Sequence, residues 1–223
     1  MKARISEIFR SIQGEGIYAG LPQVFVRFYG CSLGCRFCDT PLSHFEEIDS
    51  LELVKRIKAL SADIHSLAVT GGEPLEQADF LKVFLSLARK ENLKIYLETN
   101  GVLYKELQGV IDFVDIISMD IKLPGSTGLS AFWNEHKSFL EIASSRDAFV
   151  KAVICLSTSE EDLINAVDLI LANSNKVPLV LQPNTFELNN DLLDKISRFQ
   201  SMALKSLEDV RIIPQIHKLT GVK

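Results

Sequence analysis

The sequence predicts an α/β fold in which parallel strands form a partial TIM-like (β/α)6 barrel. Two observations support this prediction: short, nearly continuous apolar runs, and helical patterns that alternate with them along almost the whole chain. A repeated strand-then-helix order favours right-handed crossovers and a parallel sheet, which either curls into a partial barrel or lies open and doubly wound. The 223 residues contain no linker or low-complexity stretch, so we expect residues 1–223 to form a single domain.

The expected elements follow one another without a break. Strands are expected at residues 24–28, 66–70, 94–98, 116–120, 149–154, 178–182 and 210–213. Helices are expected at residues 51–60, 77–90, 103–109, 131–143, 159–172 and 190–207. Asp49 with Glu52 and Ser157 with Glu160 have the spacing of capping boxes and predict two helix starts. The N-terminal segment 5–23 is expected to add a flap or a strand.

Composition narrows the function. A composition of 47% apolar and 24% charged residues is typical of a globular protein. The net charge of −5 argues against binding of nucleic acid through a broad basic surface. The first residues lack the apolar core of a signal peptide, and no apolar run approaches the ~18 residues that span a bilayer. We therefore expect a cytoplasmic protein with no nucleic-acid or membrane partner. Its four cysteines are then metal ligands or buried thiols, because cytoplasmic thiols stay reduced.

Residues able to do chemistry gather just after the expected strands. These positions are residues 31–40, 70–73, 98–100, 118–122, Gln182 and 214–217. In either architecture of a parallel sheet, ligands bind at the carboxyl ends of the strands. The sequence therefore predicts one site at that end.

Cys31, Cys35 and Cys38 form the most specific motif, with spacing C-x3-C-x2-C directly after the first parallel strand. Iron–sulfur clusters prefer thiolate ligands, and three cysteines offered to four irons leave one iron open for a further ligand. The alternatives are a structural zinc site or three unrelated cysteines. Zinc sites usually add a second pair of Cys or His ligands, which Cys155 and the four histidines do not form. Cys155 lies in an apolar run and is interpreted as core.

The spacing resembles that of the radical S-adenosylmethionine (SAM) superfamily. The resemblance implies a [4Fe–4S] cluster whose open iron is chelated by SAM, and an electron transfer that yields a 5′-deoxyadenosyl radical. Residues 69–74, which contain Gly71, Gly72 and Glu73, resemble the segment that holds the methionyl amino group. Residues 118–122 are similar to the ribose and carboxylate contacts of related enzymes; the alternative interpretation is a solvated strand end.

Two further features indicate a flat, anionic substrate. Gln13 and Glu15 flank Gly14 in a glycine-rich run and offer donors and acceptors that match a heterocycle. Arg27 lies in a nearly apolar strand, where its planar guanidinium suits a carboxylate. The alternative for Arg27 is a salt bridge at the end of the barrel.

With residues 9–16, 38–40 and 214–218, these features resemble the 7-carboxy-7-deazaguanine synthase family over nearly the whole chain. The resemblance implies a lyase of 7-deazapurine and queuosine biosynthesis. Such a lyase converts 6-carboxy-5,6,7,8-tetrahydropterin to 7-carboxy-7-deazaguanine with release of ammonia. The family uses SAM catalytically and requires Mg²⁺. A homodimer and an external one-electron donor such as flavodoxin are expected partners.

The resemblance also assigns residues to roles. The cluster ligands are Cys31, Cys35 and Cys38, and the Mg²⁺ ligand is Thr40. The substrate-binding residues are Ile12, Gln13, Gly14, Glu15, Arg27, Thr70 and His217. The SAM-binding residues are Phe37, Cys38, Asp39, Gly72, Ser118, Lys122 and Gln182.

Two rival functions remain at this point. A glycyl-radical enzyme activase carries the same cysteine spacing, but it needs an open, protein-sized cleft. The Gln13–Gly16 segment, Arg27 and Thr40 favour a small anionic substrate instead. A non-catalytic iron–sulfur carrier would normally present a fourth cluster ligand and would not need Gly71, Gly72 and Glu73 beside the cluster.

Overall fold

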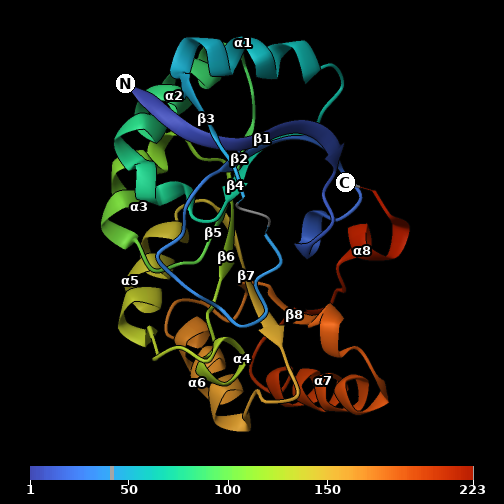
Figure 1. Ribbon diagram of the computed structural model, residues 1–223. Coiled ribbons are helices and arrows are strands. Elements are labelled where there is room, and N and C mark those ends of the chain that lie inside the picture. The colour runs from blue at the N-terminus through green and yellow to red at the C-terminus, as the bar shows by residue number, and fades with distance from the viewer. Residues whose placement is uncertain (41–42, 223) are drawn as a thin grey trace.

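The computed structural model describes residues 1–40 and 43–222, and strands and helices alternate along them (Figure 1). The strands are β1 (Lys2–Ile12), β2 (Pro22–Phe28), β3 (Glu46–Asp49), β4 (Ser66–Gly71), β5 (Ile95–Thr99), β6 (Ile116–Asp120), β7 (Asp147–Ile154), β8 (Leu179–Pro183) and β9 (Val210–Ile212). The α-helices are α1 (Ser50–Leu60), α2 (Ala78–Lys90), α3 (Tyr104–Val110), α4 (Pro124–Thr127), α5 (Trp133–Ala143), α6 (Glu160–Leu171), α7 (Asn190–Ala203) and α8 (Ile216–Thr220). Every expected strand and helix is present, with boundaries that differ by a few residues.

The strands form one curled sheet in the order β3-β1-β2-β4-β5-β6-β7-β8-β9. From β2 and β4 through β9 each neighbouring pair is parallel, whereas β1 runs antiparallel to both β2 and β3. Because β3 and β9 stand at opposite edges of this order, the barrel is open. The predicted partial TIM-like barrel is confirmed, and the N-terminal segment forms a strand followed by a short 3-10 turn, Gly16–Tyr18.

Helices cover the outer face of the sheet and bury its apolar side chains (Figure 1). In α2, Phe80, Leu81, Phe84, Leu85 and Ala88 repeat at helical spacing and are all buried. Burying a Leu or Phe side chain of this kind contributes roughly 2 kcal/mol. This outer core fixes the curvature of the sheet and leaves its inner face for the site.

The inner face carries an apolar cluster at the amino ends of the strands. There Phe25, Tyr96, Phe149 and Val180 form a separate buried cluster, against which Ile17, Tyr18 and two further apolar side chains pack. Gly16, at φ +68°, lies directly on the Phe149 ring, so close that a Cβ would come within 2.5 Å of its Cζ atom. The turn Gly16–Tyr18 therefore closes this end of the barrel.

One predicted helix cap is confirmed and one is wrong. The Asp49 carboxylate accepts the backbone N–H groups of Leu51 and Glu52, as expected of an N-cap. At α6 the cap is Ser159, which forms a reciprocal capping box with Asp162. Ser157 instead donates its hydroxyl to the Gly125 carbonyl at 2.6 Å. A serine followed three residues later by an acidic residue occurs twice here, at Ser157 and at Ser159. Only the second serine caps the helix, because the first lies in the turn before it.

The sequence did not predict β3, α4 or α8. Each is short, and β3 is an edge strand in which Ile48 alone is buried. Neither propensity nor periodicity is informative over so few residues. Among the described residues, no helix has the length and apolar character needed to cross a membrane.

Candidate active site

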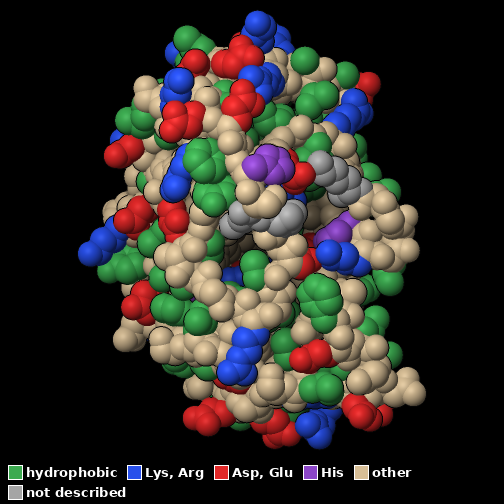
Figure 2. Space-filling view, in the orientation of Figure 1, with side chains coloured by type: hydrophobic (Ala, Val, Ile, Leu, Met, Phe, Trp, Pro, Cys, Tyr) green, Lys and Arg blue, Asp and Glu red, His purple; other side chains and the backbone are tan. Residues whose placement is uncertain are grey.

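A cavity of about 440 Å³ opens at the carboxyl ends of the parallel strands, and Figure 2 shows the hollow near the middle of the face. This volume is within the usual range for small-molecule sites, about 300–1,000 Å³. Successive strands contribute inward side chains to its wall: Arg27 (β2), Thr70 (β4), Glu98 (β5), Asp120 (β6), Lys151 (β7) and Gln182 (β8). The loop after β2 and the C-terminal segment complete it. A cavity is thus present where the sequence predicts the site.

The three motif cysteines line one side of this cavity. Their loop is shaped by backbone contacts: the Cys38 N–H donates to the Cys35 carbonyl at 3.1 Å, and the Arg36 N–H donates to Thr127 at 3.0 Å. Burial raises the pKa of the Cys31 and Cys35 thiols above the ordinary value, while the ammonium of Lys122 acts in the opposite direction. Binding to iron would stabilise the thiolates that burial disfavours.

These cysteines fit a [4Fe–4S] cluster. All four cysteines are free of disulfides. Among the described residues no three His, Cys, Asp or Glu side chains lie close enough together to bind one metal ion. A cubane cluster does not require this, because each cysteine binds a different iron. The cluster loop also packs tightly on Gly72, where a Cβ would lie 2.1 Å from the Gly30 carbonyl oxygen. Only glycine permits that approach.

The Glu73 carboxylate, outside the cavity lining, connects the segments at the carboxyl ends of β4 and β5. It accepts the backbone N–H groups of Leu75 and Asn100 and the Thr99 hydroxyl. Burial raises the pKa of Glu73 to about 7, although these donors favour the charged form. The Glu73 N–H donates to the Gly30 carbonyl at 2.8 Å, which ties this segment to the cluster loop. Gly71 and Gly72 line the cavity, whereas Glu73 does not.

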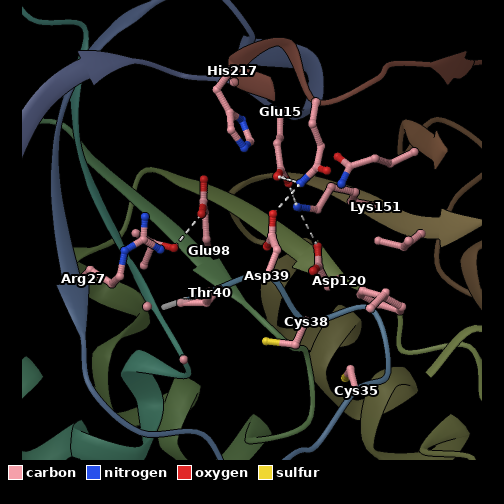
Figure 3. Close-up of a pocket in the computed structure, with 18 of the residues that line it drawn as sticks. Glu15, Arg27, Cys35, Cys38, Asp39, Thr40, Glu98, Asp120, Lys151 and His217 are labelled. Carbon is pink, nitrogen blue, oxygen red and sulfur yellow. Dashed lines mark hydrogen bonds and ion pairs between the residues drawn. The ribbon is translucent and has the colours of Figure 1, made fainter. Parts of the chain in front are cut away.

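Arg27 lies on the side of the cavity opposite Lys151, and Glu98 lies between them (Figure 3). Arg27 pairs with Glu7 at 3.0 Å, so the structure shows the salt bridge that was its alternative interpretation, at a position that also lines the cavity. Glu98 accepts the Thr70 hydroxyl at 2.6 Å and the Gln13 amide at 2.8 Å. It has no cationic partner among the ion pairs of the described residues.

Gln13 is 2% exposed, and its side chain is fully engaged within the protein. Besides Glu98, its amide donates to Gln23 at 3.0 Å, and its oxygen accepts the Glu15 N–H at 3.0 Å. Its side chain therefore positions Glu98 and the following backbone. Ile12, Gly14 and Glu15 line the cavity beside it.

A line of alternating charges crosses the other side of the cavity (Figure 3). Lys151 contacts both Glu15 and Asp120, the latter at 3.3 Å. Lys122 holds the second Asp120 oxygen at 2.8 Å, and its ammonium lies 5.7 Å from the centre of the Phe37 ring. This line connects the N-terminal loop to the cluster loop.

The C-terminal segment lies over the cavity. The Ile216 N–H donates to the Gly14 carbonyl at 2.9 Å, and the His217 ring packs on Gly14. The Gln215 amide reaches Glu15 at 2.8 Å, and Lys218 pairs with Asp39 at 2.9 Å. The sequence left the place of this segment open, because no local pattern relates residues 200 positions apart.

The structure brings almost all the predicted site residues together. The following line the cavity: Ile12, Gln13, Gly14, Glu15, Arg27, Cys31, Cys35, Phe37, Cys38, Asp39, Thr40, Thr70, Gly72, Lys122, Gln182 and His217. Ser118 is the exception: it is 3% exposed and lies beneath the cavity, two residues before Asp120 on the same strand face. Sequence reasoning assigned no role to Lys151, and it included Asp120 only as part of the segment 118–122. A lone lysine inside the apolar run 149–154 was the available signal.

Comparison with known proteins gives three kinds of match: a family, individual relatives and a solved structure. The Radical SAM superfamily matches residues 25–170. The 7-carboxy-7-deazaguanine synthase of Geobacter sulfurreducens is 39% identical, over 98% of this chain and 97% of that protein. The synthase of Methanothermobacter thermautotrophicus is 32% identical, over 100% and 99%. In fold, the chain is similar to the crystal structure of QueE from Escherichia coli, with a TM-score of 0.66 at 22% identity over 97% and 95% of the two chains.

The matched residues span most of the barrel and the cysteine loop, and the chain belongs to the radical SAM superfamily. Membership implies a [4Fe–4S] cluster and SAM. Because full-length relatives reach 39% identity, the chain belongs, within that superfamily, to the 7-carboxy-7-deazaguanine synthase family.

Proposed function

We propose that this chain converts 6-carboxy-5,6,7,8-tetrahydropterin to 7-carboxy-7-deazaguanine with release of ammonia, in 7-deazapurine and queuosine biosynthesis. The observation that carries the proposal is one cavity that holds the three cluster cysteines, Arg27 and Glu98 together. Family membership supports the reaction, and the cavity is a place where a small anionic heterocycle would lie next to the cluster.

Arg27 and Glu98 define the substrate end. The Arg27 guanidinium would take the substrate carboxylate in a bidentate pair, in exchange for or in addition to Glu7. Glu98 keeps acceptor capacity beyond its bonds to Thr70 and Gln13, so it would accept N–H donors from the edge of the pterin ring. We propose that Ile12, Gly14 and Glu15 contribute backbone contacts there, with His217 above them.

The opposite end would hold SAM. Gln182 has a buried side-chain oxygen with no hydrogen-bond partner among the described residues, and the residue lines the cavity. We propose that it bonds to SAM, together with Phe37, Cys38, Asp39, Gly72 and Lys122. When the cluster and SAM are bound, they supply the one-electron chemistry that generates the hydrogen-abstracting radical. The protein residues orient both ligands and exclude water.

Thr40 would be the protein ligand of Mg²⁺. It follows Asp39 and lines the cavity between Arg27 and the cysteines (Figure 3). Its hydroxyl is a hard oxygen donor, and Mg²⁺ accepts few protein ligands when substrate and water complete its shell.

We expect Thr40→Ala to keep its cluster and its SAM binding and to lose most Mg²⁺-stimulated turnover. The metal would hold the substrate in its reactive orientation, and such orientation lowers a barrier by several kcal/mol. The measurement is turnover against Mg²⁺ concentration, with Thr127→Ala as a control, because that hydroxyl is satisfied within the fold. An unchanged Mg²⁺ response in Thr40→Ala would place the metal elsewhere.

We further propose a cytoplasmic, homodimeric enzyme whose single domain spans residues 1–223 and which receives electrons from an external donor such as flavodoxin. Free cysteines at an iron–sulfur site suit a reducing compartment. Light scattering on the reconstituted enzyme tests the dimer.

The function is tested by an anaerobic assay of the reconstituted protein with the tetrahydropterin, SAM, Mg²⁺ and dithionite. We expect 7-carboxy-7-deazaguanine and ammonia in equal amounts, detected by mass spectrometry and an ammonia assay. SAM binding without product from this substrate would overturn the proposed reaction and leave the superfamily assignment intact.

A further inference from the structure

Lys151 is a buried cation that the proposed reaction leaves without a role. It lies on β7, and its side chain is 8% exposed. Phe149, two residues earlier on the same strand face, belongs to the apolar cluster at the amino end of the barrel. A buried ammonium is costly unless it is paired. Lys151 is therefore held in place by its contacts to two carboxylates, Glu15 and Asp120.

The two carboxylates belong to different parts of the cavity. Glu15 lies in the N-terminal loop, where its other oxygen accepts the Gln215 amide at 2.8 Å. Asp120 ends β6, where its other oxygen pairs with Lys122 beside the cluster loop. A displacement of either carboxylate must therefore move the ammonium or break an ion pair within a largely buried site.

The charges reinforce each other. Burial works to lower the pKa of Lys151, but Asp120 and Glu15 hold that pKa well above the ordinary value. Burial works to raise the pKa of Glu15, but Lys151 and Gln215 keep it below the ordinary value. The ammonium and the Glu15 carboxylate are thus both charged at neutral pH, and their attraction is stronger than it would be in water.

We propose that Lys151 is a positioning residue that couples the binding of the pterin to the binding of SAM. The inference rests on the proposed function, because Glu15 borders the substrate end and Asp120 the SAM end. A ligand that fixes one carboxylate sets the position of the ammonium, and the ammonium then sets the other carboxylate. Lysine suits this role because its ammonium is a compact charge with three donors, two of which these contacts use.

Coupling of this kind is reciprocal and is measured by affinities without turnover. In the absence of a reductant SAM is not cleaved, so both ligands stay intact on the reconstituted holoenzyme. Calorimetry then gives the dissociation constant of SAM with and without saturating 6-carboxytetrahydropterin. We expect the substrate to tighten SAM binding about tenfold in the parent enzyme, within the range typical of coupled sites.

Lys151→Met should reduce this ratio to about one, since it removes the charge and keeps most of the side-chain volume. Lys122→Met is the matched control: it also loses an Asp120 contact but has no contact with Glu15. It should weaken SAM binding with and without substrate and leave the ratio unchanged. If Lys151→Met does not assemble a cluster, Glu15→Gln cuts the same link from the other side and should also bring the ratio to about one.

Each outcome bears on a different claim. A parent enzyme that does not bind the tetrahydropterin would overturn the proposed function. A parent that binds both ligands with a ratio of one would overturn the coupling alone. A tenfold ratio that persists in Lys151→Met or Glu15→Gln would show that the coupling runs through other residues.

Discussion

The two ends of the barrel interior are built on the same strands but differ completely in character. On β7, Phe149 faces inward at the amino end, and Lys151, two residues later, faces inward at the carboxyl end. On β5, Tyr96 and Glu98 show the same change over the same spacing. Because a strand repeats every two residues, each pair lies on one face. The amino end is a small apolar core, and the carboxyl end adds charged side chains to the cavity wall.

The difference separates stability from function. Apolar side chains at the amino end contribute to the free energy of unfolding through burial, which does not depend on ligands. The charged side chains at the carboxyl end pair with one another and gain less from folding, because burial of each charge is costly. Changes at the amino end should therefore lower the melting temperature, and changes at the carboxyl end should alter ligand binding and turnover.

The largest expected effect is loss of the cluster in Cys35→Ala. Two thiolates are left at the cavity, too few to hold the [4Fe–4S] cluster of this superfamily. Iron content and visible absorption after anaerobic reconstitution give the measurement, and activity should be lost. Cys155→Ala is the control, since Cys155 is 2% exposed and lies outside the cavity lining. Loss of iron in Cys155→Ala with retention in Cys35→Ala would reverse the site assignment.

The amino end is tested by Phe149→Ala. The Phe149 ring is fully buried, and removing such a ring costs about 3–5 kcal/mol. For a chain of this size the melting temperature should fall by about 10 °C. The test is demanding because Gly16, which packs on this ring, directly follows the cavity residue Glu15. We expect KM for the pterin to change less than about twofold; a tenfold rise with an unchanged melting temperature would show that the two ends are not separate.

Much of this comparison was predictable from the sequence, and for a physical reason. Continuous apolar runs locate the parallel strands, and the carboxyl-end rule then gathers the cysteines, Arg27 and Thr70 into one site. The rule depends only on strand direction, so it tolerates errors of a few residues in the boundaries.

The remaining features depend on distant contacts. Lys151 and its pairing with Asp120 were missed because the partners of Lys151 come from another strand and a loop. Gln13 was assigned to substrate, yet its side chain is occupied by Gln23 and Glu98. Ser118 stays a predicted SAM contact, but it faces the barrel interior one layer below the cavity, a depth that the sequence did not indicate. A strand pattern gives the face of a residue and not its height in the barrel.

Arg27→Lys should produce a moderate effect at the carboxyl end. Lysine keeps the charge but loses the planar fork that pairs with a carboxylate. We expect KM for the tetrahydropterin to rise about tenfold, which corresponds to about 1.4 kcal/mol, with the cluster and the melting temperature retained. Steady-state kinetics at saturating SAM gives the answer. Because Arg27 also pairs with Glu7, a drop in melting temperature with unchanged KM would make it a structural residue.

The smallest effect is expected from Tyr18→Phe at the amino end. The Tyr18 hydroxyl donates to Asp147 at the start of β7, and burial together with this bond raises the pKa of Tyr18 to about 12. A raised pKa favours the protonated form in the fold, so the contribution is present below pH 10 and is lost as the pH rises through about 12. The bond to Asp147 lies at the surface, so Tyr18→Phe should lower the unfolding free energy at pH 8 by less than about 1 kcal/mol. The melting temperatures of the parent and the variant should therefore differ slightly at pH 8 and converge under alkaline conditions, while kinetics on the pterin stay the same. A constant difference across that pH range would assign the effect to ring packing against Tyr96 and Phe149 and not to the hydrogen bond.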